Sequence, residues 1–351
     1  MSDPRISRRN FIRGAAVGAA AFSGLAAAGD YSPPDVIPPG ANPNIIAHPD
    51  KIIVYPTGNQ DWDFQSLQSA FSEYTQKKII LMDRTIGGIP KDFVLGDGYA
   101  VEVTRDASLI GYGNGSKILG GYAAFMDDGI LHNLSIQKIF FQGQSTAAVL
   151  GNFNKIDIVS SGVNPDPVPY PACGFVIACN GSINLVNNTI QHTWLGIFVG
   201  GAPQGGRINS QRIISDECGI YLSGATTYFF NSLLYLDISG NHIACSNGAL
   251  SNIILNGGAI GNKITGNKFL GNSLIANVFI GTDASDTMVR TGAGSVSGGV
   301  NPEPVPKPLI IDLGLNSDIK GNFIMHNSIS PEDMERIISM EYIIQGLFNI
   351  E

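Results

Sequence analysis

Two adjacent carboxylates, Asp216 and Glu217, follow Arg212 closely in the sequence. Side chains of these types can transfer protons or hold a cation. In a lyase that cleaves polyuronates, acids hold Ca²⁺, and an arginine or lysine removes the proton next to the uronate carboxylate. Asp216, Glu217 and Arg212 are therefore the candidate catalytic residues, and Ca²⁺ is the cofactor that a lyase reaction would need.

These residues lie in the clearest repeat of the chain. Residues 188–199 align with residues 211–222 at a constant offset of 23. The first half of the motif, an asparagine two residues before an isoleucine or phenylalanine, recurs at variable spacing at Asn154, Asn241, Asn267 and Asn322. A fixed period of this size indicates stacked coils. Asparagine suits one turn position because its amide can bond the same position in neighbouring coils and because it tolerates a left-handed backbone.

The composition agrees with an all-β protein. Only 14% of the residues are charged and 43 are glycine, which suits many short strands and tight turns. The repeats resemble those of the pectin-lyase-like superfamily, and this resemblance covers the body of the chain. It implies a single-stranded right-handed parallel β-helix over residues 51–330, and it specifies the fold without specifying the reaction.

Residues 1–29 resemble a twin-arginine signal peptide. Arg8 and Arg9 precede an alanine- and glycine-rich stretch, and small residues at 26–29 suit a cleavage site. The alternative is an ordinary Sec signal or a short membrane anchor. The twin-arginine route implies a periplasmic or secreted protein, and no later apolar run is long enough to predict a transmembrane segment after signal removal. Residues 30–50 predict a proline-rich linker.

Short helices are expected at both ends of the β-helix, where they would cover the end coils. Residues 61–76 place Phe64, Leu67, Phe71 and Tyr74 at helical spacing, with Asp61 and Asp63 as capping acids. Residues 331–351 predict the second cap helix. It follows an N-cap at Ser330, begins with Pro331 and continues with apolar residues at Met334, Ile337, Ile338 and Met340.

Two proline-rich segments match each other, at residues 162–171 and 299–308. Alternating prolines favour extended geometry without ladder hydrogen bonds. Both segments are expected to be loops that stand off the helix body, either as a clamp on an extended chain or as simple spacers.

Alternation along the aligned strands predicts which side chains face outward. Val176, Phe198 and Tyr221 form one outward column, with Trp194 and His192 at its rim. An aromatic column of this kind would suit stacking against sugar rings, and the alternative is that loops cover it. A second outward column contains Lys155, Thr189, Arg212, His242 and Lys268. It would hold an acidic polysaccharide, or it would serve solubility.

Charge and cysteine usage narrow the function classes. A net charge of −8 without a basic tail argues against nucleic-acid binding. The spacing of Cys173, Cys179, Cys218 and Cys245 indicates no zinc site, and no metal ligands are assigned. Cys173 and Cys218 align two coils apart, too far for a disulfide, so buried thiols are favoured.

Residues 215–220 resemble part of the polygalacturonase motif, in which two aspartates and a cysteine precede a strand. This resemblance implies that Asp216 and Glu217 act as acid and base beside a glycosidic bond. Most of the motif is missing, because Thr193 and Trp194 stand where that family has a further aspartate. Two hypotheses follow: an exported lyase or glycoside hydrolase acting on an acidic polysaccharide, or a non-catalytic cell-surface or extracellular protein that binds a glycan or a protein. The sequence indicates no oligomeric state.

Overall fold

The structure is a computed structural model. It describes residues 42–348 except 83, 87–88, 96–99, 121–122, 128–130, 144–146, 152, 166–171, 202, 204, 224–234, 247, 257, 271–272, 282–283, 285–286, 291–308, 314–318, 321–322 and 326–328. The expected signal peptide and the proline-rich segment 299–308 lie outside the described residues.

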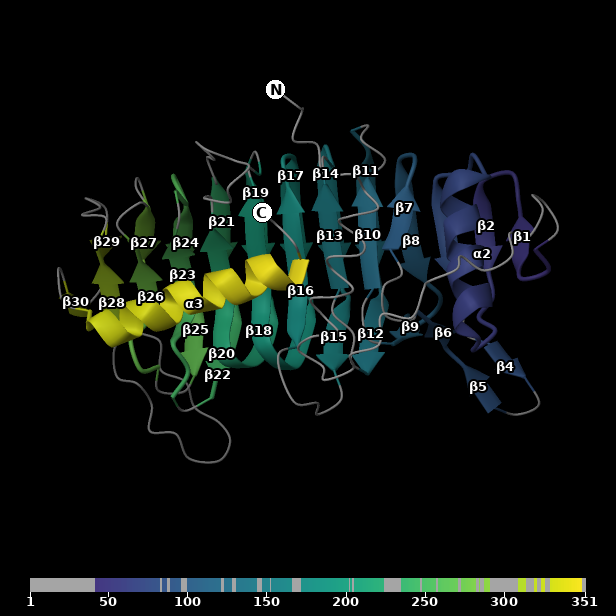
Figure 1. The fold of residues 1–351 in the computed structure, drawn as a ribbon. Helices are drawn as coiled ribbons and strands as arrows, with labels where there is room; N and C mark the ends of the chain where they lie inside the picture. Colours follow the sequence, from purple (N-terminus) through teal and green to yellow (C-terminus); the bar gives the residue numbers. More distant parts are fainter. Residues whose placement is uncertain are drawn as a thin grey trace, which may run out of the picture.

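Short strands stack in parallel register into a β-solenoid, as the repeats predict (Figure 1). One sheet forms what we call face 1. Its strands are β1 (Ile45–Ala47), β2 (Lys51–Val54), β3 (Lys78–Leu81), β8 (Ala107–Gly111), β11 (Asn133–Gln137), β14 (Lys155–Val159), β17 (Ser182–Val186), β19 (Gly206–Asn209), β21 (Leu236–Ser239), β24 (Lys263–Thr265), β27 (Met288–Arg290) and β29 (Ile319–Lys320).

The second sheet bends into two faces along its long strands β18 (Thr189–Gly201) and β20 (Arg212–Ser223). Face 2 contains their first halves with β6 (Phe93–Val94), β9 (Ser116–Leu119), β12 (Ile139–Gly143), β15 (Gly162–Pro165), β22 (His242–Cys245) and β25 (Lys268–Leu270). Face 3 contains their second halves with β7 (Ala100–Val103), β10 (Ala123–Asp127), β13 (Ala147–Gly151), β16 (Cys173–Cys179), β23 (Ser251–Asn256), β26 (Ala276–Ile280), β28 (Leu309–Asp312) and β30 (Phe323–Met325). A separate antiparallel hairpin joins β4 (Arg84–Ile86) to β5 (Ile89–Lys91).

Side-chain alternation explains the core. Ile197, Val199, Ile220 and Leu222 point inward and are fully buried, as the aligned repeats predict. The same interior positions are aliphatic or aromatic in neighbouring turns, so one continuous apolar column runs through the solenoid. Burial of these side chains is the main stabilising contribution.

Two predicted boundaries differ from the structure. Within the segment predicted to be a linker, β1 pairs antiparallel with β2, because its backbone extends the edge of face 1. Within the first proline-rich segment, residues 162–165 form β15, which pairs with β12 and β18. That half of the segment therefore belongs to the solenoid wall and does not stand off it, and residues 166–171 lie outside the described residues.

Helix α2 (Gln60–Ser72) covers the N-terminal end of the solenoid. Its N-cap is Asn59, whose side chain accepts hydrogen bonds from the backbone of Asp61 and Trp62, so neither predicted acid is the cap. Asp63 is instead buried and accepts from the backbone of Thr57, Gly58 and Val94. The bond to Val94 occupies an N–H group at the edge strand β6, which is what an end cap must do.

Helix α3 (Pro331–Phe348) begins as predicted but lies in a different place. Ser330 Oγ accepts a hydrogen bond from the Asp333 backbone at 3.1 Å and donates to its carboxylate at 2.8 Å, so Ser330 is the N-cap, as predicted. The helix does not cross the last turn as a plug. It runs lengthwise along the outside of face 3, from the region of β28 back toward β16 (Figure 1).

Candidate functional site

Three basic residues lie side by side on the outside of face 2. Arg212 pairs in register with His242, which pairs with Lys268, and Thr189 precedes them in the neighbouring turn. All three basic side chains are exposed, and adjacent strands lie about 4.8 Å apart. The predicted alignment of these four residues is found in the structure, and their binding role stays a prediction.

One member of the predicted column is misplaced. Lys155 lies on β14 of face 1, where it pairs with Asn133 and Ser182 and forms an ion pair of 2.8 Å with Asp157. The error arose because Asn154 is followed by the same residue pattern as Asn188. The residue that truly precedes Thr189 in the column is Gly162.

The column continues toward the N-terminus with an aromatic residue that the repeat alignment missed. Gly162 pairs with Phe140, which pairs with Lys117. A Cβ atom on Gly115 would come within 2.3 Å of the Phe140 ring, and one on Gly162 within 3.2 Å. The glycines therefore leave room for the half-buried ring to lie close to the backbone. The basic-aromatic column is defined as Lys117, Phe140, Gly162, Thr189, Arg212, His242 and Lys268.

A buried amide ladder fixes the position of this column. Each basic residue directly follows a buried Gln or Asn: Gln211, Asn241 and Asn267. Asn241 accepts from the backbone of Gln211 at 2.9 Å and donates to the Ile208 carbonyl at 2.9 Å, and Asn267 accepts from the Asn241 backbone at 3.0 Å. The residue with a left-handed backbone is not the amide residue itself but the one directly before it, for example Ser210 before Gln211 and Gly240 before Asn241. The ladder thus holds successive turns in register.

The charge around the column differs along its length. The next outward column contains Leu119, Gln142, Asn164, Ile214, Ala244 and Leu270. At the N-terminal end, Asp92 directly precedes Phe93, which pairs with Ile118, so an acid lies next to Lys117. The row from Arg212 to Lys268 is basic on a chain with a net charge of −8, and such a row attracts polyanions.

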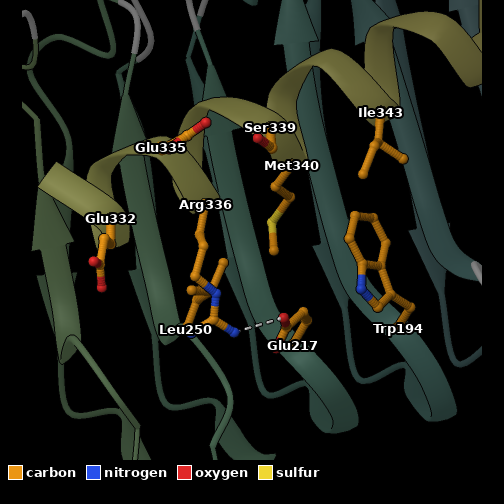
Figure 2. Close-up of a pocket in the computed structure, with 9 residues that line it drawn as sticks. All are labelled: Trp194, Glu217, Leu250, Glu332, Glu335, Arg336, Ser339, Met340 and Ile343. Carbon is orange, nitrogen blue, oxygen red and sulfur yellow. Dashed lines mark hydrogen bonds and ion pairs between the residues drawn. The ribbon is translucent and has the colours of Figure 1, made fainter.

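A groove separates α3 from the corner between faces 2 and 3. It has a volume of about 510 Å³, and it is lined by Trp194, Glu217, Leu250, Glu332, Glu335, Arg336, Ser339, Met340 and Ile343 (Figure 2). Trp194, Glu217 and Leu250 precede residues that pair in register, so they form a column along the corner. Arg336 reaches down from the helix to Glu217, with Nη2 3.2 Å from Oε1.

Glu217 is the one carboxylate in that corner column. Burial raises the pKa of its carboxyl above the usual value and the nearby Asp216 adds to this rise, whereas Arg336 opposes it. Asp216 itself is exposed and accepts a hydrogen bond of 2.7 Å from Ser246 Oγ in the next turn. The two acids therefore have different environments, one under the helix and one outside it.

The predicted aromatic column exists, but it is closed to a ligand. Val176, Phe198 and Tyr221 pair in register and point outward, and they are nevertheless fully buried. They cluster with Ile337 and Met340 of α3, so the helix occupies the outside of face 3. The Phe198 and Tyr221 rings stack with centroids 5.9 Å apart. The column is therefore covered, and its cover is helix α3 and not the loops considered from the sequence.

The candidate catalytic set is not brought together. Arg212 lies on face 2 and is absent from the groove lining, whereas Glu217 lines the groove. Trp194 is half-buried in the groove, and His192 is exposed at the bend of β18 with a left-handed φ of 56°. In the described part of the chain no three His, Cys, Asp or Glu side chains gather as metal ligands. Ca²⁺ needs six to eight oxygens, so this corner does not fit it.

The four cysteines are free and buried, as predicted. Cys173 pairs with Leu195, which pairs with Cys218, so the two thiols lie two turns apart. Burial raises the pKa of Cys173 to about 12, which makes a nucleophilic role implausible at neutral pH.

Comparison with known proteins gives no relative. No family model, no curated protein and no solved structure matches the chain. Among the described residues, no helix is long and apolar enough to cross a membrane. The functional argument therefore depends on the geometry of the two surfaces described above.

Proposed function

We propose that this protein is exported and binds an acidic polysaccharide along the basic-aromatic column of face 2 without cleaving it. The observation that carries the proposal is the register of Arg212, His242 and Lys268, which places three exposed basic side chains on adjacent turns of one flat face.

The spacing supports a polymer as the ligand. Arg212 and Lys268 are separated by two strand spacings, or roughly 10 Å. A regular row of cations at this interval can meet successive carboxylate or sulfate groups of an extended chain, whereas a small anion would contact only one or two of them. From Thr189 to Lys268 neither outward column contains an acid, which avoids repulsion of such a ligand there.

Phe140 adds a second kind of contact. Its ring lies on the same column, two turns before Thr189, and is partly exposed. Aromatic rings stack against the apolar faces of sugars, so Phe140 would hold a sugar ring while the basic residues bind its acidic groups. The combination favours an acidic glycan over a simple polyphosphate.

Three observations support binding without catalysis. Arg212 lies on a different face from Glu217, so the predicted base does not stand beside that acid. The Glu217 carboxylate is paired with Arg336. The aromatic residues Phe198 and Tyr221 are covered by α3.

The test is binding of the purified protein to immobilised polyuronate, with a neutral polysaccharide as the reference. Arg212→Gln with Lys268→Gln is expected to weaken binding at least about tenfold and to reduce its salt dependence. The control is Lys77→Gln with Lys263→Gln, which changes net charge equally on face 1 and should leave binding unchanged. Equal losses in both double variants would mean that only overall charge matters, and would contradict the proposal.

A second candidate function is cleavage of a glycan in the groove under α3. It is favoured by the position of Glu217 beside Trp194 in the groove, where burial raises the pKa of the carboxyl, the direction that a general acid requires. Its test is the release of new reducing ends or unsaturated products from uronic-acid polymers, with Glu217→Gln as the inactive variant. Tight binding without any product would favour the non-catalytic proposal.

A further inference from the structure

His242 lies in the basic-aromatic column between two residues whose charge is permanent. It pairs in register with Arg212 on one neighbouring strand and with Lys268 on the other. All three side chains are exposed. Arginine and lysine stay protonated at neutral pH, whereas histidine is the side chain that ordinarily changes its charge between about pH 5 and pH 8. A histidine at this position makes the charge of the row depend on pH.

The backbone holds the three residues in one line. The N–H of His242 donates to the Gln211 carbonyl at 2.8 Å, and the N–H of Lys268 donates to the Asn241 carbonyl at 2.8 Å. Because the three residues lie on adjacent strands, the two ends of the row are roughly 10 Å apart, with His242 midway between them. An extended polyanion that contacts both Arg212 and Lys268 must therefore pass over His242.

Among the described residues of these strands, no acid occupies an outward position next to His242. Its outward neighbours are the two permanent cations and three apolar residues, Ile214, Ala244 and Leu270. On its own strand, Cys245 is buried. The first acid along the three strands is Asp216, four residues beyond Arg212 at the bend of β20, where it accepts a hydrogen bond from Ser246. No carboxylate of these strands therefore competes with a bound anion for the imidazole.

Protonation of His242 and binding of a polyanion then favour each other. A carboxylate or sulfate that lies over the imidazole stabilises its protonated form, and the protonated imidazole in turn attracts the anion. We propose that His242 makes the binding of the acidic polysaccharide depend on pH, with tighter binding in mildly acidic solution than above neutral pH. This inference rests on the proposed function of face 2 and adds the regulation of that site. Arg212 and Lys268 keep their charges, so binding weakens at higher pH without being lost.

The test is the affinity of the purified protein for a polyuronate at low salt, measured by calorimetry at about pH 5.5 and about pH 7.5. We expect binding to be about three- to fivefold tighter at the lower pH, which is the effect of one additional exposed ion pair. The uronates stay ionised over this range, because ordinary carboxyl groups lose their proton below about pH 5. A sulfated polysaccharide, whose charge does not change in this range, is the second probe and should show the same ratio.

Two variants at the same exposed position separate the charge of the side chain from its shape. His242→Gln should bind with the weaker affinity at both pH values, and His242→Lys should bind with the tighter affinity at both. The matched control is His48→Gln, because His48 lies between β1 and β2, and its hydrogen bonds to Lys51 and Gln76 are made by its backbone. This control should keep the full pH dependence of the native protein.

Calorimetry in buffers of different ionisation enthalpy counts the protons that are taken up on binding. At about pH 6.5 the native protein should take up a fraction of one proton per binding site, and His242→Lys should take up none. Equal affinity of the native protein at both pH values, with binding still weakened by Arg212→Gln and Lys268→Gln, would overturn this inference and leave the proposed function standing. A His242→Gln variant that keeps the native pH dependence would also overturn it. Absence of binding at both pH values would overturn both proposals.

Discussion

Glu217 of β20 and Arg336 of α3 form an ion pair of 3.2 Å that joins the C-terminal helix to the corner of the solenoid. The pair is partly exposed, with 25% and 42% of the two side-chain surfaces accessible. It fixes which residue of the helix lies over which turn. The apolar contacts of Ile337 and Met340 supply most of the binding free energy between helix and sheet.

The raised pKa of Glu217 predicts how stability depends on pH. The folded protein binds the Glu217 proton more tightly than the unfolded chain does. The resulting contribution to the free energy of unfolding is complete below the ordinary carboxyl pKa, and it is lost as the pH rises through the pKa of the folded state. Relative to Glu217→Gln, the native protein is expected to lose less than about 1 kcal/mol of unfolding free energy between about pH 4 and pH 7. Urea denaturation over that pH range measures it.

Arg336→Gln should enlarge this pH effect, because Arg336 is the group that opposes the raised pKa of Glu217. Glu335→Gln, a change to an exposed neighbour, serves as the control. A native protein that gains stability over Glu217→Gln as the pH rises would show that the pKa of Glu217 is lowered instead.

The burial of Ile337 predicts that this aliphatic side chain contributes strongly to the packing of α3 on face 3. Ile337→Ala is expected to lower the free energy of unfolding by about 2–4 kcal/mol, because Ile337 is fully buried against face 3. The adjacent Ile338→Ala should cost less than about 0.5 kcal/mol, because Ile338 is 42% exposed. Chemical denaturation compares the two. Equal effects would mean that the helix does not pack in this orientation.

The amide ladder predicts a large loss from a single polar residue. Asn241→Ala removes the partners of the Gln211 N–H and the Ile208 carbonyl, both in the interior, and should cost about 3 kcal/mol. Asn209→Ala is the control, since its amide bonds Ser239 on the partly exposed surface. Thermal or urea unfolding gives both values. If Asn241→Ala lowers the free energy of unfolding less than Asn209→Ala does, the ladder does not have the proposed structural role.

Burial of the thiols predicts that they are unreactive in the folded protein. Cys173, Cys179 and Cys245 each have a pKa raised to about 12 by burial, so almost no thiolate is present at pH 8. A thiol reagent should label none of the four cysteines under native conditions and all four after denaturation. Rapid labelling of Cys218 in the native state would indicate that α3 leaves the sheet.

The solenoid was predictable from local patterns. Strand alternation and the offset of 23 residues are both visible in residues 188–222, and they place Ile197 and Ile220 inside without knowledge of any distant contact. The same alignment placed Arg212, His242 and Lys268 in one row. It failed for Lys155, because the loops between turns vary in length and the asparagine motif occurs on both faces 1 and 2.

The outward rows could not be interpreted in the same way. Alternation shows that Phe198 and Ile80 point outward, but it does not say whether another element covers them. Phe140 entered the basic-aromatic column only through the register of β12 with β15. Its sequence neighbours carry no asparagine motif, so no repeat alignment could find it.

The position of α3 is a feature that the sequence alone could not predict. Residues 330–340 by themselves determine that a capped amphipathic helix forms, because capping and apolar spacing are local properties. Which surface the helix covers depends on the fit of Ile337 and Met340 to an apolar row assembled from turns far apart in the chain. Only the tertiary structure decides that Glu217 faces Arg336, because the two residues become neighbours through the stacking of the turns between them.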